Sequence, residues 1–323
     1  MKRFSNILLI VDDRTDYAAA LKRVTTLAKN HNAHLTVCAN IDAIPSELRI
    51  GLVTIKSRDV LDVAAAKTQE WLNDTVDSVA TDGVTIATKV LVGKPFIEII
   101  RQVLRDNHDL IIKCADADSG LREIVFSSTD KHLMRKCPCP VWIMKPRERQ
   151  NYLRILAAVD QDPEEPVKDA LNRQILEISA SMASAECSEV HVVHAWEVFG
   201  EEVLRSHKWD FSEAEFEAML QEEAAGRRRW LEDLVANYGI SPDSNGTDAP
   251  GLRLHVVKGP ARYVVPELAR ELAVDLVVMG TVARTGIDGF FMGNTAESIL
   301  GELDCSVLTI KPPGFTSPVT LEG

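Results

Sequence analysis

The chain has 323 residues, 46% of them hydrophobic and 26% charged, a composition typical of globular proteins that fold into about two domains. Its net charge of −12 argues against broad affinity for nucleic acid, and the sequence contains no apolar run long enough to cross a membrane. Six cysteines are too few for a disulfide scaffold. The start, MKRFSNILLIVDD, lacks the long apolar region of a signal peptide, so we expect a cytoplasmic protein.

Apolar strands and amphipathic helices alternate through the first half of the chain. The expected strands are residues 7–11, 34–39, 84–92, 110–112 and 140–144. The expected helices are residues 18–28, 57–80, 96–105 and 130–135. Strands that alternate with helices indicate parallel βαβ units with right-handed connections.

The same order returns after a polar linker at residues 146–152. The expected strands of this half are residues 155–159, 190–195, 252–257, 276–279 and 307–310, and the expected helices are 166–184, 213–238 and 261–273. We therefore predict an α/β protein with two tandem five-stranded parallel sheets, each in the order 3-2-1-4-5. The domains would span residues 1–146 and 152–313, followed by a tail at 314–323.

An internal repeat supports this division. Residues 109–145 align without a gap with residues 275–311, so that Asp109 matches Asp275 and Gly120 matches Gly286. A repeat of this length indicates two copies of one domain rather than a solenoid. Each copy can therefore serve as a control for the other.

A ligand of such a sheet binds beyond the carboxyl ends of the strands, where the strand order reverses. In the second copy Asp160 and Gly280 lie at these ends, and Gly293 precedes the next helix. Free N–H groups at a helix start favour a phosphate, and Asn294 or Thr295 could cap the helix or donate to the anion. The alternative, turn glycines beside a helix-capping Asp160, stays open, since short glycine patterns give many false positives.

The segment 280–295 follows the spacing G-x2-G-x9-G-[ST], with Ala283 at the second glycine and Asn294 at the hydroxyl position. Three more segments recur at strand ends, namely AVD at 158–160, CPV at 139–141 and CSVL at 305–308. Together these motifs resemble the universal stress protein family, over nearly the whole chain. The resemblance implies an adenine nucleotide alpha hydrolase-like, Rossmann-like fold that binds ATP or AMP, with Mg²⁺ as a companion ion.

The resemblance also implies roles for single residues. Asp160 would recognise adenine, and Ala195, where the second strand ends, would present its backbone to the base. The implied nucleotide-binding residues are Ala158, Val159, Asp160, Ala195, Met279, Gly280, Ala283, Arg284, Gly293, Asn294 and Thr295.

The first copy departs from the pattern. Cys114 replaces Gly280 and Ser127 replaces Gly293, while Asp116, Asp118 and Glu123 add negative charge. Such charge repels phosphate. We expect no ATP in the first half, and only a neutral or cationic ligand if one binds at all.

Other reactive side chains favour structural roles. Cys137 and Cys139 fit core packing better than a redox or metal site. His191 and His194 lie three apart on a strand and should face opposite ways. The remaining candidates have no partner at metal-ligand spacing, namely His132, His207 and His255. No nucleophile and base can be paired by spacing, so any ATP hydrolysis would be slow and incidental.

The fifth strands are sheet edges that need cover. Residues 140–144 and 306–310 can pair with each other about a pseudo-twofold axis, with Trp142 and Leu308 at the contact. Whether the chain also forms a homodimer stays open. The leading interpretation is a stress-response sensor or adaptor with a nucleotide site in its second domain. The alternative is a scaffold or small-ligand carrier that acts through protein–protein contacts without a nucleotide.

Overall fold

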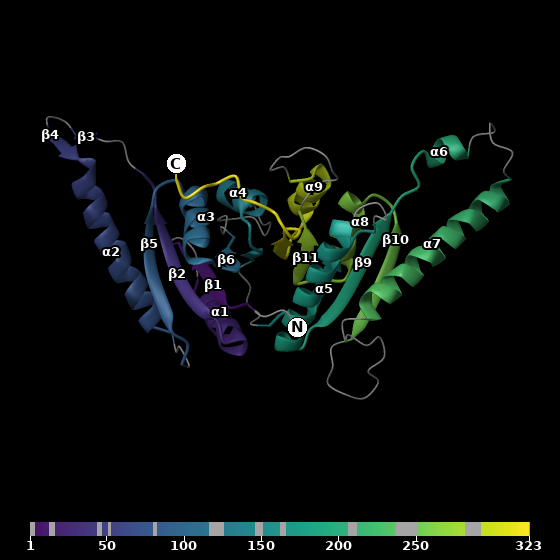
Figure 1. Ribbon diagram of the computed structural model, residues 1–323, viewed down its shortest axis with the longest axis horizontal. Helices are drawn as coiled ribbons and strands as arrows, with labels where there is room; N and C mark the ends of the chain where they lie inside the picture. Colours follow the sequence, from purple (N-terminus) through teal and green to yellow (C-terminus); the bar gives the residue numbers. More distant parts are fainter. Residues whose placement is uncertain are drawn as a thin grey trace. The chain divides into compact units, whose positions relative to one another are not determined.

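The computed structural model describes residues 4–12, 17–43, 47–50, 53–79, 83–115, 126–145, 151–161, 166–205, 212–236, 251–281 and 292–322. The chain divides into two compact units. The N-terminal unit comprises residues 3–150, 284–292 and 304–323, and the C-terminal unit comprises residues 1–2, 151–283 and 293–303. Both have the α/β architecture that the alternating pattern predicts (Figure 1).

The strands of the N-terminal unit follow the order β12-β7-β6-β1-β2-β5. They are β1 (Asn6–Ile10), β2 (His34–Ile41), β5 (Ile86–Val92), β6 (Leu110–Cys114), β7 (Val141–Met144) and β12 (Ser306–Ile310). In the central strand Leu9 lies opposite Val37 on one side and Ile112 on the other, and all three side chains are fully buried. Helices cover both faces of a parallel sheet, which is why its strands are almost continuously apolar.

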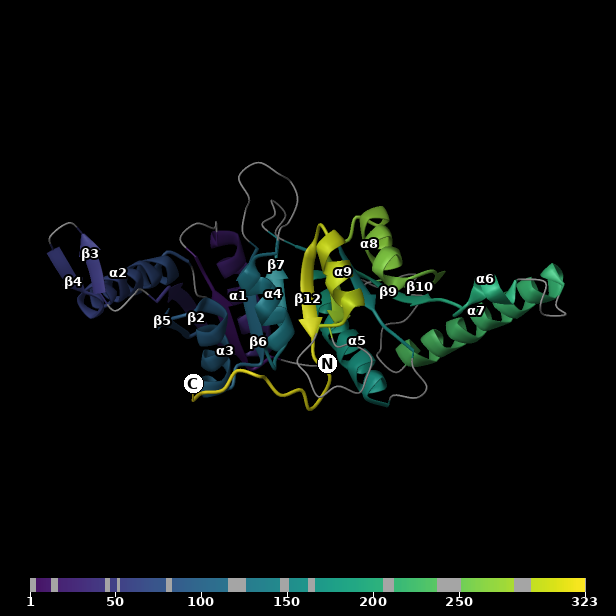
Figure 2. The ribbon, with the colours of Figure 1, turned by 90° about the horizontal axis from the view of Figure 1, so that it is seen from above.

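Four helices accompany these strands, namely α1 (Ala18–His31), α2 (Ser57–Asp77), α3 (Pro95–Asp106) and α4 (Ser128–Lys136). Figure 2 shows α1 and α2 on one side of the strands and α3 and α4 on the other. This is the arrangement that right-handed crossovers produce when the strand order reverses next to β1. A short hairpin of β3 (Glu47–Ile50) and β4 (Val53–Lys56) precedes α2 and was not expected from the sequence.

Strand β12 belongs to the N-terminal unit although it follows the C-terminal unit in the sequence. It runs antiparallel to β7, with Leu308 opposite Trp142, and both side chains are fully buried. The segment after β12 groups with the same unit, where Arg101 of α3 donates to the carbonyl oxygen of Thr320 at 3.1 Å.

The strands of the C-terminal unit follow the order β10-β9-β8-β11. They are β8 (Arg154–Ala158), β9 (Glu189–Trp196), β10 (Leu252–Lys258) and β11 (Leu276–Gly280). The helices are α5 (Pro166–Glu186), α6 (Glu201–Leu204), α7 (Glu213–Ala236), α8 (Ala261–Glu271) and α9 (Asn294–Glu302). All the pairs within this unit are parallel, so the carboxyl ends of the strands meet at one edge. In the part of the chain that the structure describes, no helix is both long and apolar enough to cross a membrane.

Candidate functional site

The carboxyl edge of the C-terminal unit gathers most of the residues that the sequence singles out. Strand β8 pairs with β9 on one side and β11 on the other, so that Ala158 lies opposite both Val193 and Met279. The order of the strands reverses between β8 and β11, and this is where doubly wound sheets bind ligands. Gly280 is the last residue of β11, and Asp160 lies two residues after the end of β8.

The backbone of Asp160 is held in place by helix α5. The amide nitrogen of Asp160 donates to Asn172 Oδ1 at 3.1 Å, and Asn172 Nδ2 donates to the carbonyl oxygen of Asp160 at 2.6 Å. Asn172 is only 2% exposed, whereas Asp160 is exposed. Asn172 thus anchors the strand end, and the carboxylate of Asp160 stays accessible at the edge.

Gly280 has a packing role in addition to any role at a ligand site. A Cβ at this position would lie 2.7 Å from Cδ2 of Leu171, well inside van der Waals contact. The absence of a side chain therefore makes room for a leucine of α5. Ala195, expected where β9 ends, lies one residue before its end and pairs with Val257 of β10.

Helix α9 begins at the same edge, and no side chain among the described residues caps it. Its N-cap is Gly293, whose amide donates to the carbonyl oxygen of Thr281 at 3.1 Å. The expectation that Asn294 or Thr295 caps the helix is wrong, because both lie within its first turn and are exposed. The first N–H groups of a helix have no partner within the helix, and they carry the positive end of its dipole. An uncapped start of this kind favours an anion.

The matching helix of the N-terminal unit begins differently. Ser127 caps α4 by accepting from the amide of Asp130 at 3.2 Å, and Asp130 accepts from the amide of Ser127 at 2.9 Å. Asp130 is fully buried, and its Oδ1 lies 3.1 Å from Nζ of the buried Lys113. The carboxylate of Asp130 therefore occupies the place where a phosphate would meet the helix.

The C-terminal copy lacks this internal anion. In the repeat Asp130 aligns with Ala296 and Lys113 aligns with Met279, and both of these residues are buried and apolar. Neither can neutralise the start of α9. The two copies thus differ in whether a carboxylate of the same domain neutralises the start of this helix.

A cluster of larger side chains beside the edge was missed from the sequence. His194 Nδ1 lies 3.4 Å from the carbonyl oxygen of Val159, and Arg227 Nη1 lies 3.2 Å from His194 Nε2. Burial lowers the pKa of His194, and a neutral ring can donate through Nδ1 while Nε2 accepts from Arg227. The guanidinium also lies 5.2 Å from the ring centre of Trp196. These residues bring a cation of α7 close to the strand ends.

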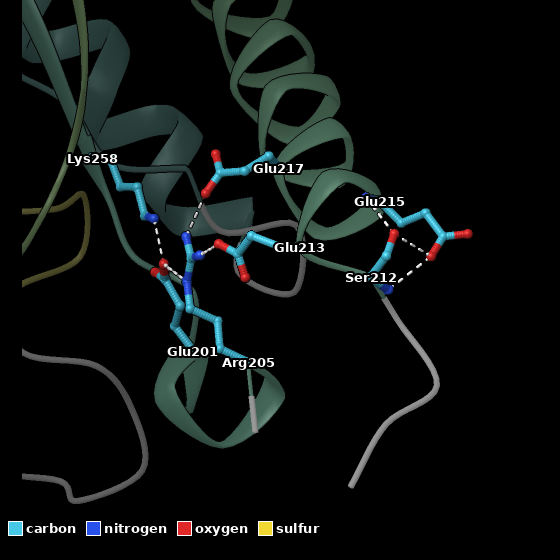
Figure 3. Close-up of polar contacts among 7 residues, drawn as sticks. All are labelled: Glu201, Arg205, Ser212, Glu213, Glu215, Glu217 and Lys258. Atoms are coloured by element: carbon cyan, nitrogen blue, oxygen red, sulfur yellow. Dashed lines mark hydrogen bonds and ion pairs between the residues drawn. The ribbon is translucent and has the colours of Figure 1, made fainter. Parts of the chain in front are cut away.

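Helix α6 forms part of the rim above this edge and is tied to α7 by charged side chains (Figure 3). Arg205 contacts Glu201 at 3.2 Å, Glu217 at 2.6 Å and also Glu213. Lys258, at the end of β10, lies 2.6 Å from Glu201. The contacts hold α6 over a small apolar cluster that consists of Trp196, Phe216 and Leu220, with Val198, Leu204, Ala224 and Val256 packed against it.

The histidines of β9 face opposite ways, but His255 does have a partner. His191 Nδ1 lies 3.0 Å from His255 Nε2, and the two rings stack with their centres 5.2 Å apart. Spacing along the chain provides His255 with no partner as a metal ligand, and the structure adds a contact that spacing does not reveal, since His255 lies on β10 beside His191. Within the described residues no group of three or more His, Cys, Asp or Glu side chains is placed to hold a metal ion.

This histidine pair predicts a pH dependence of stability. Burial is the main cause that lowers the pKa of both His191 and His255 below the ordinary value of about 6.5. The unfolded chain then binds more protons than the folded chain below that pH. We expect the free energy of unfolding to be fully present above about pH 6.5 and to fall as the pH drops toward 5. Urea unfolding across this range should show a shallower decline in His255→Phe, and an equal decline in both proteins would contradict the assignment.

The cysteine pair is part of the core of the N-terminal unit. Cys137 and Cys139 are buried, and their sulfur atoms lie 3.4 Å apart. The hydrogen bond with Cys137 and burial raise the pKa of Cys139, which keeps it a thiol. The core-packing interpretation of both residues is confirmed.

The structure brings together nine of the eleven residues that the sequence assigns to nucleotide binding. They are Ala158, Val159, Asp160, Ala195, Met279, Gly280, Gly293, Asn294 and Thr295. The others, Ala283 and Arg284, lie outside the described residues, as do Asp116, Asp118, Glu123 and His207.

Comparisons with known proteins agree with this architecture. The model of the universal stress protein family matches residues 3–145 and again residues 151–311. The chain is 30% identical over 326 aligned positions to Universal stress protein E of Escherichia coli strain K12, covering 100% of this chain and 98% of that protein. It is 26% identical to Universal stress protein E of Photorhabdus laumondii, covering 99% and 98%.

Solved structures share the fold over the same extent. A protein of unknown function from Pseudomonas aeruginosa PAO1 has a TM-score of 0.67 at 26% identity, covering 96% of this chain and 93% of that one. A universal stress protein from Archaeoglobus fulgidus has a TM-score of 0.62 at 16% identity, covering 95% and 98%. Two matches of one family model, together with a relative aligned along its whole length, identify this chain as a member of the universal stress protein family with two tandem domains.

Proposed function

We propose that this stress-response protein binds an adenine nucleotide, ATP or AMP, at the carboxyl edge of its C-terminal unit and acts in the cytoplasm as a sensor or adaptor. The observation that carries the proposal is the uncapped start of helix α9 where the strand order reverses. An anion there would meet free backbone N–H groups and the positive end of the helix dipole.

The residues around this point suit the parts of a nucleotide. The exposed carboxylate of Asp160 is an acceptor for the amino group of adenine, on a backbone that Asn172 holds rigid. Asn294 and Thr295 are exposed in the first turn of α9, where their amide and hydroxyl groups can donate to phosphate oxygens. Mg²⁺ would accompany the phosphates of ATP and neutralise part of their charge.

The N-terminal unit serves as the partner domain in this proposal. Its helix α4 already has an anion in the carboxylate of Asp130, and Lys113 balances that charge. A phosphate would have to displace a buried ion pair, which makes nucleotide binding there unfavourable. The C-terminal domain would then bind the nucleotide, and the N-terminal domain would contribute structure and protein contacts.

One observation favours a second candidate function. The side chain of Leu171 occupies the space beside Gly280, where the family pattern calls for a close backbone approach. An apolar group at this point suits a small uncharged ligand better than a ribose. A carrier of such a ligand, acting through protein–protein contacts, is therefore the alternative.

Calorimetry on a matched pair of variants separates the candidates. Asp160→Ala removes the proposed adenine contact, and Asp12→Ala removes the aspartate that follows the first strand of the other copy. Loss of a hydrogen bond to a charged group costs about 1.5–3 kcal/mol, so we expect ATP and AMP affinity to fall about tenfold or more in Asp160→Ala. Asp12→Ala should bind as the wild type does.

Two results would count against the nucleotide. Absence of heat from the wild type with ATP or AMP at millimolar concentration would favour the carrier. Equal losses in Asp12→Ala and Asp160→Ala would place the nucleotide elsewhere.

A further inference from the structure

The N-terminal unit carries a cluster of cations around the ring of Phe96, which we call the Phe96 cluster: Lys94, Phe96, His132 and Lys136. The ammonium nitrogen of Lys94 lies 5.1 Å from the ring centre of Phe96, and that of Lys136 lies 4.7 Å from it. The imidazole of His132 stacks on the same ring with the centres 4.2 Å apart. Both lysine distances are measured to one ring, so the two ammonium nitrogens lie within about 10 Å of each other.

The cluster carries two permanent positive charges, those of Lys94 and Lys136. Among the described residues, neither Lys94 nor Lys136 has a carboxylate within ion-pair distance. Lys94 is also the N-cap residue of α3, where its charge adds to the positive end of the helix dipole. Such an arrangement is unfavourable in isolation and becomes favourable once an anion is present.

The pKa of His132 responds to the same positive charges. Burial lowers its pKa, and the further causes are the three cations Lys136, Arg135 and Lys94. From the residues that the structure describes, no carboxylate contributes in the opposite direction. Its Nδ1 atom is buried and has no hydrogen-bond partner within the described residues.

The other copy of the domain shows that the fold does not require these cations. In the repeat Lys131 aligns with Glu297, His132 with Ser298 and Arg135 with Gly301, while Lys136 aligns with Glu302. The surface that is basic in one copy is acidic in the other. The difference is notable because the whole chain carries a net charge of −12.

Shielding of Phe96 does not account for the cluster. Lysine stems often cover an apolar ring while the ammonium group stays in water, and one cation–π contact is a common structural feature. Phe96 is 7% exposed with these side chains around it, but cover of the ring does not require that two of them carry a positive charge. The cost of holding like charges together remains.

We propose that the Phe96 cluster is a binding site for a small anion with more than one phosphate charge. Lys94 and Lys136 contribute the charge, and His132 contributes a donor once it takes up a proton. Lysine ammonium groups suit phosphate because each donates in several directions as a compact charge. The site lies in the N-terminal unit, for which the sequence alone suggested only a neutral or cationic ligand, and it does not depend on the nucleotide proposed for the C-terminal unit.

The test uses inorganic pyrophosphate and the full chain, with NMR observation of the imidazole of His132 at fixed ionic strength. The His132 signal is assigned by comparison with His132→Gln. We expect saturable binding and a rise in the pKa of His132, because an anion favours the charged ring. Lys94→Gln/Lys136→Gln should weaken binding at least about tenfold, and Lys94→Arg/Lys136→Arg should retain it.

A matched control separates the site from general electrostatics. Lys22→Gln/Lys67→Gln removes the same charge from exposed helix positions elsewhere in the unit, and it should leave binding unchanged. Equal weakening in this control, or a His132 signal that does not respond to pyrophosphate, would overturn the proposal. Pyrophosphate bound at α9 would leave the His132 signal unmoved, so failure here and failure of the nucleotide proposal can be told apart.

Discussion

Asp130→Ala should lower the free energy of unfolding of the N-terminal unit by about 3–5 kcal/mol, because it removes the buried carboxylate that lies beside the charge of Lys113. Asp130 is fully buried 3.1 Å from Lys113 Nζ, and it also closes the cap of α4. Lys113→Met should lower the free energy of unfolding by a similar amount, because it removes the ammonium group beside the buried carboxylate of Asp130. Hydrogen exchange of peptides from β6 and α4 measures the loss within this unit.

The double variant provides the control, and the second copy supplies its design. Lys113→Met/Asp130→Ala introduces the pair Met279 and Ala296 that the C-terminal copy has at these positions. Replacing both members of a buried ion pair by apolar residues is often neutral, so most of the loss should be recovered. A double variant as unstable as the sum of the two single variants would mean that the pair does not interact.

Trp142→Ala should cost the N-terminal unit about 3–5 kcal/mol, as expected when a large aromatic side chain is removed from a core. Trp142 is 0% exposed on β7 and lies opposite Leu308 of β12. Its removal leaves a cavity at the junction between these strands. Hydrogen exchange of β7 and β12 peptides should rise together.

Trp71→Ala is the matched control for this substitution. Trp71 lies on α2, is partly exposed and meets Tyr17 edge-on with ring centres 5.4 Å apart. Its loss should be clearly smaller, because the site can admit water. Comparable losses in the two variants would contradict the placement of Trp142 in the core.

The alternating pattern predicts the main elements because each is long enough to express its own period. Helix α7, for example, spans Glu213–Ala236 against an expected 213–238. The hairpin β3–β4 and helix α6 were missed because each element has only four residues. Four residues hold only two repeats of the strand period or one helical turn, too few to tell the two apart unless the segment is a continuous apolar run, as in β7.

Part of the candidate site could also be predicted from the sequence. The carboxyl ends of parallel strands must meet, so Asp160 and Gly280 could be placed together without coordinates. Leu171 and Arg227 could not, since their positions depend on how helices pack on the sheet. His255 was missed because its place beside His191 follows from strand register rather than from spacing along the chain.

One missed feature did leave a signal in the sequence. Ser127 followed three residues later by Asp130 is the pattern of a capping box. Gly293 and Ala296 at the matching positions of the second copy cannot form one. Comparison of the repeats at these four positions would have predicted which helix start is free.

The placement of β12 has a consequence for how the protein is made. The N-terminal unit cannot complete its sheet until residues 306–310 have left the ribosome, long after β7 has been synthesised. During that interval the edge of β7 remains available to other nascent chains, which is a hazard for aggregation. A gene fragment that ends at residue 150 should therefore yield an aggregation-prone polypeptide. Adding a synthetic peptide with the sequence of β12 should restore its solubility.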